Sequence, residues 1–144
     1  MAGRRILALD VGSRRIGVAM SDPLGLTAQG LPTLLRTTTA ADIAAIQRLA
    51  EQQGIGTIVV GLPIRTTGHR GPEAERVETF ADALAAATGR PVLRWDERFS
   101  TAEGARVLRE HGVNTRRSKP HLDRLAAQLI LQGYLEANRP LKEP

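Results

Sequence analysis

The sequence predicts an α/β fold built on a mixed five-stranded sheet with helices on both faces. Two β-like runs near the N-terminus, Arg5 to Asp10 and Arg15 to Ser21, are separated by a turn short enough for an antiparallel hairpin. After a third run, helix-like and strand-like segments alternate, which is typical of parallel pairing. A chain of 144 residues has the usual size of one domain, so we expect residues 1–144 to form one.

The predicted strands differ in how they would be covered. The first is apolar on both faces, as expected of a central strand. The third, around Gly30 to Arg36, contains Pro32, which cannot donate a backbone hydrogen bond and suits only an edge strand or a bulge. The fourth, Thr57 to Gly61, is a β-branched run typical of a buried parallel strand, and the fifth is Val92 to Trp95.

Four helices are predicted from their capping residues and apolar spacing. Thr39 caps the first, and Gly54 lies past its end. Pro72 suits the first turn of the second helix, and Ser100 with Glu103 forms a capping box for the third. The helices are expected at Thr39 to about Gln53, Pro72 to the stop at Gly89 and Pro91, Ser100 to near Gly112, and Pro120 to about Ala137.

Composition excludes several kinds of protein and of site. The chain contains no cysteine, so neither a disulfide scaffold nor a thiolate metal site can form. His69, His111 and His121 are too scattered to suggest a zinc site, so any metal is expected to be a hard ion held by oxygen. No apolar stretch approaches the ~20 residues of a membrane span, and the start MAGRR lacks the apolar core of a signal peptide. We therefore expect a cytoplasmic protein that does not bind membranes.

An excess of positive charge favours polyanionic partners. The 20 Lys and Arg residues outnumber the 15 Asp and Glu residues, which leaves a formal charge of +5. The basic residues gather near the first predicted turn and near the start of the last predicted helix. These two clusters are Arg4, Arg5, Arg14 and Arg15, and Arg116, Arg117, Lys119 and Arg124. Nucleic acid is therefore the partner to expect.

Acidic residues stand at three places where a carboxylate is costly. Asp10 ends the first predicted strand, and Asp96 and Glu97 lie at the end of the fifth. Asp123 falls within the broad apolar arc of the last helix. An ionised carboxylate that points inward is strongly unfavourable unless a cation or hydrogen-bond donors offset it.

Each acid has an ordinary structural role available when taken alone. Asp123 could form a buried salt bridge with an arginine, and Asp10 could cap the turn that follows it. Asp96 could pair with Arg98. Together the acids fit one site better, because ligands bind at the carboxyl ends of strands in α/β sheets and no matching set of inward basic residues accounts for them.

The type of ligand indicates the chemistry. Oxygen ligands with a net charge of about −3 suit Mg²⁺ or Mn²⁺. Two such ions, ~3.5–4 Å apart, can stabilise both the attacking water and the leaving oxygen in phosphodiester hydrolysis. The basic residues beside the acids would then hold the substrate backbone. The pattern therefore predicts a metal-dependent nuclease.

Four motifs, in order along the chain from Leu7 to Glu136, resemble those of the YqgF family, whose members are also called RuvX-like or Holliday junction resolvases. The resemblance implies an RNase H-like fold and a metal-dependent nuclease that matures the 5′ end of precursor 16S ribosomal RNA. Older descriptions of the family infer Holliday junction cleavage. The motifs are LALDVGSRRIGVAMSD, IVVGLP followed by Gly68 and Gly71, PVLRWDERFST, and RSKPHLDRLAAQLILQGYLE.

The resemblance also implies which residues form the active site. Asp10, Glu97 and Asp123 match the acidic positions of the family, and they would be both the catalytic residues and the metal ligands. Alternation along the fifth strand directs Asp96 and Glu97 to opposite sides, so the sequence leaves open which of the two faces Asp10. Two residues depart from the family's motifs: Phe99 stands where we expect Leu, and Pro120 stands where we expect a less constrained residue.

Five basic residues are predicted to bind the substrate. Arg15 and Arg98 adjoin the acids, and Arg116, Arg117 and Lys119 could grip nucleic acid through its phosphates. An ordinary solvated loop accounts for the last three equally well.

Other functions remain open at this point. A Holliday junction resolvase in DNA recombination or repair is one, and a non-catalytic nucleic-acid-binding module is another. An actin-like or sugar-kinase ATPase also begins with Asp-x-Gly at a hairpin, but it needs two lobes, and 144 residues supply one. No short signature for the 2′-hydroxyl distinguishes RNA from DNA, although the resemblance favours RNA. A homodimer is expected only because two-fold dimers are the commonest assembly.

Overall fold

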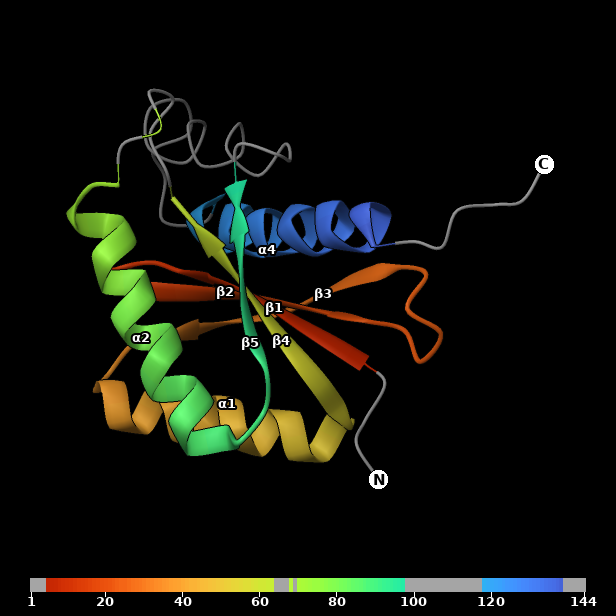
Figure 1. The fold of residues 1–144 in the computed structure, drawn as a ribbon, viewed down its shortest axis with the longest axis horizontal. Coiled ribbons are helices and arrows are strands. Elements are labelled where there is room, and N and C mark those ends of the chain that lie inside the picture. Colours follow the sequence, from red (N-terminus) through yellow and green to blue (C-terminus); the bar gives the residue numbers. More distant parts are fainter. Residues whose placement is uncertain (1–4, 64–67, 69, 98–117, 139–144) are drawn as a thin grey trace.

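Five strands and three helices make up the part of the chain that the structure describes (Figure 1). The computed structural model describes residues 5–63, 68, 70–97 and 118–138. None of the helices in these ranges is long and apolar enough to cross a membrane. The third predicted helix, from Ser100 to Gly112, lies outside the described residues. The strands are β1 (Arg5–Val11), β2 (Arg15–Ser21), β3 (Ala28–Leu35), β4 (Ile55–Leu62) and β5 (Val92–Asp96), and the helices are α1 (Thr39–Gln53), α2 (Pro72–Thr88) and α4 (Ser118–Ala137).

The strands form one sheet in the order β3-β2-β1-β4-β5, with β1 in the centre. β2 runs antiparallel to both β1 and β3, whereas β4 runs parallel to both β1 and β5. Helices α1 and α2 cover one face of the sheet, and α4 covers the other (Figure 1). The predicted mixed five-stranded sheet with helices on both faces is therefore confirmed.

Strand β3 carries the proline that the sequence placed at an edge or a bulge. It begins at Ala28, two residues earlier than predicted, and it is an edge strand. The pairing of β2 with β3 also shifts register between Ile16 and Val18. Pro32 is tolerated because an outer strand leaves one side of its backbone without a ladder partner.

Two helix starts differ slightly from the prediction. Thr38, rather than Thr39, caps α1, and its hydroxyl oxygen accepts a hydrogen bond from the Ala41 backbone N–H at 3.1 Å. Helix α4 begins at Ser118, so Pro120 lies within its first turn. A proline is tolerated there because the first backbone N–H groups of a helix have no partner within the helix.

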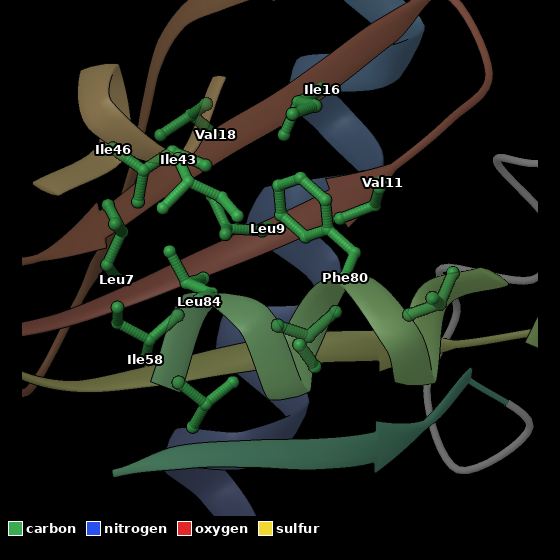
Figure 2. Packing of buried hydrophobic residues seen from close by; sticks show 14 of the residues in the cluster. Leu7, Leu9, Val11, Ile16, Val18, Ile43, Ile46, Ile58, Phe80 and Leu84 are labelled. Carbon is green, nitrogen blue, oxygen red and sulfur yellow. The ribbon is translucent and has the colours of Figure 1, made fainter. Parts of the chain in front are cut away.

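Alternation along the central strand divides the core into two layers. Leu7, Leu9 and Val11 of β1 point towards α1 and α2 and pack in the same cluster as Phe80 (Figure 2). Between them, Ala8 points to the opposite face and packs against the apolar side of α4. Residues of even number in β1 therefore face α4.

The face of the sheet beneath α4 is built from small residues. Ala8 and Ala19 contribute to it, together with glycines in β2, β3 and β4. A Cβ atom on Gly17 would lie 2.0 Å from the carbonyl oxygen of Asp123, which is too close for any real side chain. The backbone of α4 therefore rests directly on β2.

Asp22 organises the turn between β2 and β3. Its carboxylate accepts hydrogen bonds from the backbone N–H groups of Thr27, Leu26 and Leu24 at 2.6, 2.7 and 3.1 Å respectively. These bonds, with that from Thr27 contributing most, hold the pKa of the Asp22 carboxyl below its ordinary value of 3.8.

We expect Asp22→Asn to remove a pH-dependent part of the stability. Because folding lowers this pKa, the ionised carboxylate stabilises the fold above pH 3.8, and that contribution is lost as the pH falls through the lowered pKa. Urea unfolding should show the wild type more stable than the variant at neutral pH, with the difference shrinking below pH 3.8. A difference of the same size in neutral and strongly acidic buffer would contradict the prediction.

Candidate active site

The three acids predicted to form the site are buried. Asp10, Glu97 and Asp123 are 1%, 3% and 5% exposed. Asp10 lies two residues after Ala8, so alternation along β1 directs its side chain to the α4 face of the sheet. Three carboxylates from three separate elements are therefore withdrawn from water, a cost that must be offset by positive charge or by donors.

Gly17 brings Asp10 and Asp123 together. It lies directly opposite Asp10 in the ladder between β1 and β2. Its missing side chain leaves the space that the carbonyl group of Asp123 occupies. Because opposite residues of an antiparallel pair direct their side chains to the same face, the carboxylate of Asp10 lies beside the N-terminal part of α4.

Glu97 approaches the same place from the other side of β1. Its Oε1 atom lies 2.7 Å from the position that a Cβ atom on Gly61 would take. Gly61 follows Val60, and Val60 pairs with Leu9, so Gly61 is the neighbour of Asp10 on β4. A glycine at this position leaves room for an acid beside Asp10.

Alternation along β5 separates Asp96 from Glu97. The side chain of Arg94 binds acids of α2, whereas Trp95 packs edge-to-face against Tyr134 of α4, with ring centres 6.1 Å apart. Asp96 then belongs to the α2 face and Glu97 to the α4 face. The geometry therefore favours Glu97 in the choice that the sequence left open.

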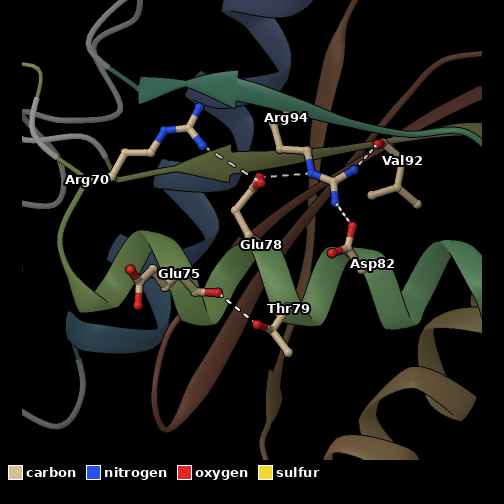
Figure 3. Close-up of polar contacts among 7 residues, drawn as sticks. All are labelled: Arg70, Glu75, Glu78, Thr79, Asp82, Val92 and Arg94. Atoms are coloured by element: carbon tan, nitrogen blue, oxygen red, sulfur yellow. Dashed lines mark hydrogen bonds and ion pairs between the residues drawn. The ribbon is translucent and has the colours of Figure 1, made fainter.

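Arg94 ties the short edge strand β5 to α2 (Figure 3). Its Nε atom donates to Glu78 at 3.0 Å, and a terminal nitrogen donates to Asp82. Arg70 lies 3.9 Å from the other carboxylate oxygen of Glu78. This network anchors the strand from whose end Glu97 projects.

Arg15 pairs with Asp123. Its Nε atom donates to Oδ2 of Asp123 at 2.7 Å, across 108 residues of sequence. Arg15 begins β2 and shares a face with Gly17, so it points towards α4. This contact is the buried salt bridge with an arginine that the sequence left open for Asp123. The predicted contact between Arg15 and a substrate phosphate stays a prediction.

The chemistry of the donor set suits a hard divalent cation. Three buried carboxylates, on β1, just after β5 and on α4, offer oxygen donors of the kind that Mg²⁺ and Mn²⁺ prefer. Among the described residues, however, no group of three or more His, Cys, Asp or Glu side chains is placed so that it could hold an ion. Arg15 already holds Oδ2 of Asp123, so a metal at this carboxylate would lie beside the Arg15 guanidinium.

A family model described as RuvX, Holliday junction resolvase, matches residues 4–137. The chain belongs to the RuvX family. Three relatives carry the name "Putative pre-16S rRNA nuclease". That of Koribacter versatilis is 51% identical over 92% of this chain and 86% of its own length. That of Moorella thermoacetica is 50% identical over 92% and 94%. That of Myxococcus xanthus is 47% identical over 94% and 90%.

Solved structures show the fold of this RuvX family member. Thermus thermophilus RuvC in complex with a Holliday junction substrate is 16% identical, with a TM-score of 0.55 over 93% of this chain and 96% of that one. The fowlpox virus Holliday junction resolvase is 14% identical, with a TM-score of 0.50 over 92% and 98%. The expected RNase H-like fold is therefore confirmed.

The other predicted substrate-binding residues of this RuvX family member are not placed by the structure. Arg98, Arg116 and Arg117 lie outside the described residues. Lys119 lies within α4, but its side chain is outside the described part. Their contacts with nucleic acid stay predictions.

Arg36 and Asp42 form a largely buried ion pair that supports the β1–β2 turn, and the sequence did not predict it. The Nε atom of Arg36 donates to Asp42 at 3.1 Å, and a terminal nitrogen donates to the carbonyl of Gly12 at 3.0 Å. The backbone N–H of Arg36 donates to the carbonyl of Arg14 at 2.9 Å, and its guanidinium lies 5.2 Å from the centre of the Phe80 ring. The turn between β1 and β2 is therefore held from the α1 and α2 side. An acid in the first turn of a helix is common, so no sequence signal set Asp42 apart.

A surface hollow of about 320 Å³ lies away from the acids, between the β2–β3 turn and α4. Leu26, Leu125 and Leu129 contribute to its lining, and none of the three buried acids does. Its walls mix apolar and polar side chains, and Glu136 is the one carboxylate among the described lining residues, so they offer no carboxylate pair to a divalent cation. The α4 face near Gly17 and Gly61 is therefore the better candidate for the active site.

Proposed function

We propose that this RuvX family member is a metal-dependent nuclease that hydrolyses phosphodiester bonds during 5′-end processing of pre-16S rRNA. The observation that carries the proposal is the burial of three carboxylates, those of Asp10, Glu97 and Asp123, on segments that Gly17 and Gly61 allow to pack closely. The names of relatives that are 47–51% identical over at least 92% of the chain support pre-16S rRNA as the substrate.

Each part of the chain has a distinct role in this proposal. Asp10, Glu97 and Asp123 would hold Mg²⁺ or Mn²⁺ through their oxygens. When bound, the metal supplies an activated water and stabilises charge on the leaving oxygen. Burial of the acids keeps bulk water away and strengthens their electrostatic interactions. The residues that would bind and orient the phosphate backbone are Arg15, Arg98, Arg116, Arg117 and Lys119.

Holliday junction cleavage is the second candidate function. The description of the matching family model favours it, and the RuvC structure that shares the fold contains a junction substrate. We rank it below rRNA processing because the relatives of about 50% identity are named for pre-16S rRNA, whereas the junction-bound neighbour is only 16% identical. A role in rRNA processing would place the protein in the cytoplasm, and a homodimer is the assembly that sedimentation should test first.

The test compares three substrates under identical conditions. They are an RNA with a 5′ precursor extension of 16S rRNA, a single-stranded DNA of the same sequence, and a four-way DNA junction, each with Mg²⁺, with Mn²⁺ or with EDTA. We expect cleavage of the RNA with either metal and none with EDTA. Cleavage of the junction alone would favour the second function. Binding of nucleic acid without cleavage of any substrate would indicate a non-catalytic module and overturn the proposal.

A further inference from the structure

We propose that Arg15 competes with a divalent metal for Asp123, so that the guanidinium lowers the affinity of this carboxylate for the metal. This inference rests on the proposed function, because it takes Asp123 to be a metal ligand. It goes further in giving Arg15 a role before any substrate binds.

The contact between the two side chains is short and largely shielded from water. Nε of Arg15 lies 2.7 Å from Oδ2 of Asp123. The side chain of Asp123 is 7% exposed, whereas that of Arg15 is 23% exposed. A charge-assisted hydrogen bond of this length in a buried setting is among the stronger polar contacts in proteins. The carboxylate therefore has its charge balanced, and the arginine keeps one side open to solvent.

A metal bound to either carboxylate oxygen of Asp123 would lie within a few ångströms of the Arg15 guanidinium. Two positive groups within about 4–6 Å repel each other strongly where water is largely excluded. The carboxylate, in turn, cannot stay buried without a cation except at a high cost in stability. Exchange of one cation for the other keeps Asp123 neutralised throughout.

The exchange needs little movement of the backbone. The carbonyl of Arg15 accepts a hydrogen bond from the N–H of Gly12 at 2.9 Å, and Arg36 donates to the carbonyls of Gly12 and Arg14 in the same turn. The start of β2 is thereby fixed, and rotation of the partly exposed Arg15 side chain is enough to release Asp123. The released guanidinium would lie at the edge of the site, where the sequence predicts it to meet phosphate.

Arg14 offers a matched control for an experiment on Arg15. Both variants, Arg15→Gln and Arg14→Gln, remove one positive charge from adjacent positions, but Arg14 is exposed and the ion pair with Asp123 is made by Arg15. Mn²⁺ binding can be measured by calorimetry and by quenching of Trp95, the only tryptophan, which lies two residues before Glu97. We expect Arg15→Gln to bind Mn²⁺ about tenfold more tightly than the wild type. We expect Arg14→Gln to differ by less than about twofold, because solvent screens its charge.

Thermal unfolding in EDTA gives a readout that does not depend on activity. Arg15→Gln should unfold at a lower temperature than the wild type, because Asp123 loses its counter-ion, and Mn²⁺ should raise its melting temperature by more than it raises that of the wild type. If Arg15→Gln does not fold, Arg15→Met also removes the charge but keeps an unbranched apolar stem. Its Mn²⁺ affinity should also exceed that of Arg14→Gln.

The outcomes separate this inference from the proposed function. Equal Mn²⁺ affinity in the Arg15 and Arg14 variants, together with weaker binding by Asp123→Asn, would overturn the competition and leave Asp123 as a ligand. Undiminished Mn²⁺ binding by Asp123→Asn would remove Asp123 from the metal site, and both proposals would fail at that residue. Tighter binding by the Arg15 variants alone supports the competition.

Discussion

Replacing Asp10 with Asn is expected to reduce cleavage of nucleic acid by about 1,000-fold or more while the protein remains folded. Asn keeps the shape of the side chain and one of its oxygens, but it removes the negative charge that would hold the cation. Asp and Asn have nearly the same shape at this 1% exposed position, so the melting temperature in EDTA should stay close to that of the wild type. The measurements are the rate of RNA cleavage with Mn²⁺ and thermal unfolding of the same preparation.

Asp22→Asn is the matched control for this experiment. It makes the same chemical change in an acid of the β2–β3 turn, on a partly exposed carboxylate that belongs to no part of the proposed site. Its cleavage rate should equal that of the wild type at neutral pH. A variant at Asp10 that cleaves at the wild-type rate would exclude this residue from the mechanism.

Gly17→Ala is expected to cost about 3 kcal/mol or more in the free energy of unfolding, at or above the upper end of the usual range for overpacking. The added methyl group would lie 2.0 Å from the carbonyl oxygen of Asp123 and 2.7 Å from its carbonyl carbon. These are backbone atoms of α4, so no side-chain rotation can relieve the clash. The helix would have to lift from the sheet and lose its packing against Ala8 and Ala19. Urea unfolding measures the loss directly.

Gly30→Ala provides the comparison on the same face of the sheet. Gly30 pairs with Ala19 across β2 and β3, and a Cβ atom there would meet the side chain of Arg124, at 2.4 Å from Cγ and 2.5 Å from Cδ. A flexible side chain can move where a helix backbone cannot, so Gly30→Ala should destabilise the protein much less. Equal losses at the two glycines would show that the spacing between α4 and β2 is not set by Gly17.

Much of the fold could be predicted because local signals and the global architecture agree. The doubly apolar first strand is the centre of the sheet, and Pro32 lies in an edge strand with a register shift beside it. Asp10 and Asp123 could be singled out because a charged residue within an apolar segment can be recognised from the sequence alone. The RNase H-like fold followed from motifs spread over almost the whole chain.

The contacts between the acids and their partners could not be predicted in the same way. Arg15 and Asp123 lie 108 residues apart, and their pairing depends on how α4 is placed along β2. That placement depends on Gly17, because a Cβ atom at this position would clash with the backbone of α4. The sequence alone does not reveal this role, since a glycine in a strand can equally mark a bulge or a tight bend. The sequence likewise could not show whether Asp96 or Glu97 faces Asp10, because that depends on which residues at the end of β5 point towards α4.

The support that Arg36 gives to the β1–β2 turn has a mechanical consequence. Exposed loops commonly open at little cost in free energy, and Ser13 and Arg14 are exposed. This tip is instead fastened to the α1 and α2 face of the sheet, because Arg36 donates hydrogen bonds to both Gly12 and Asp42. We therefore expect the end of the sheet that carries Asp10 to stay rigid, so that any adjustment to a bound polymer falls on other segments.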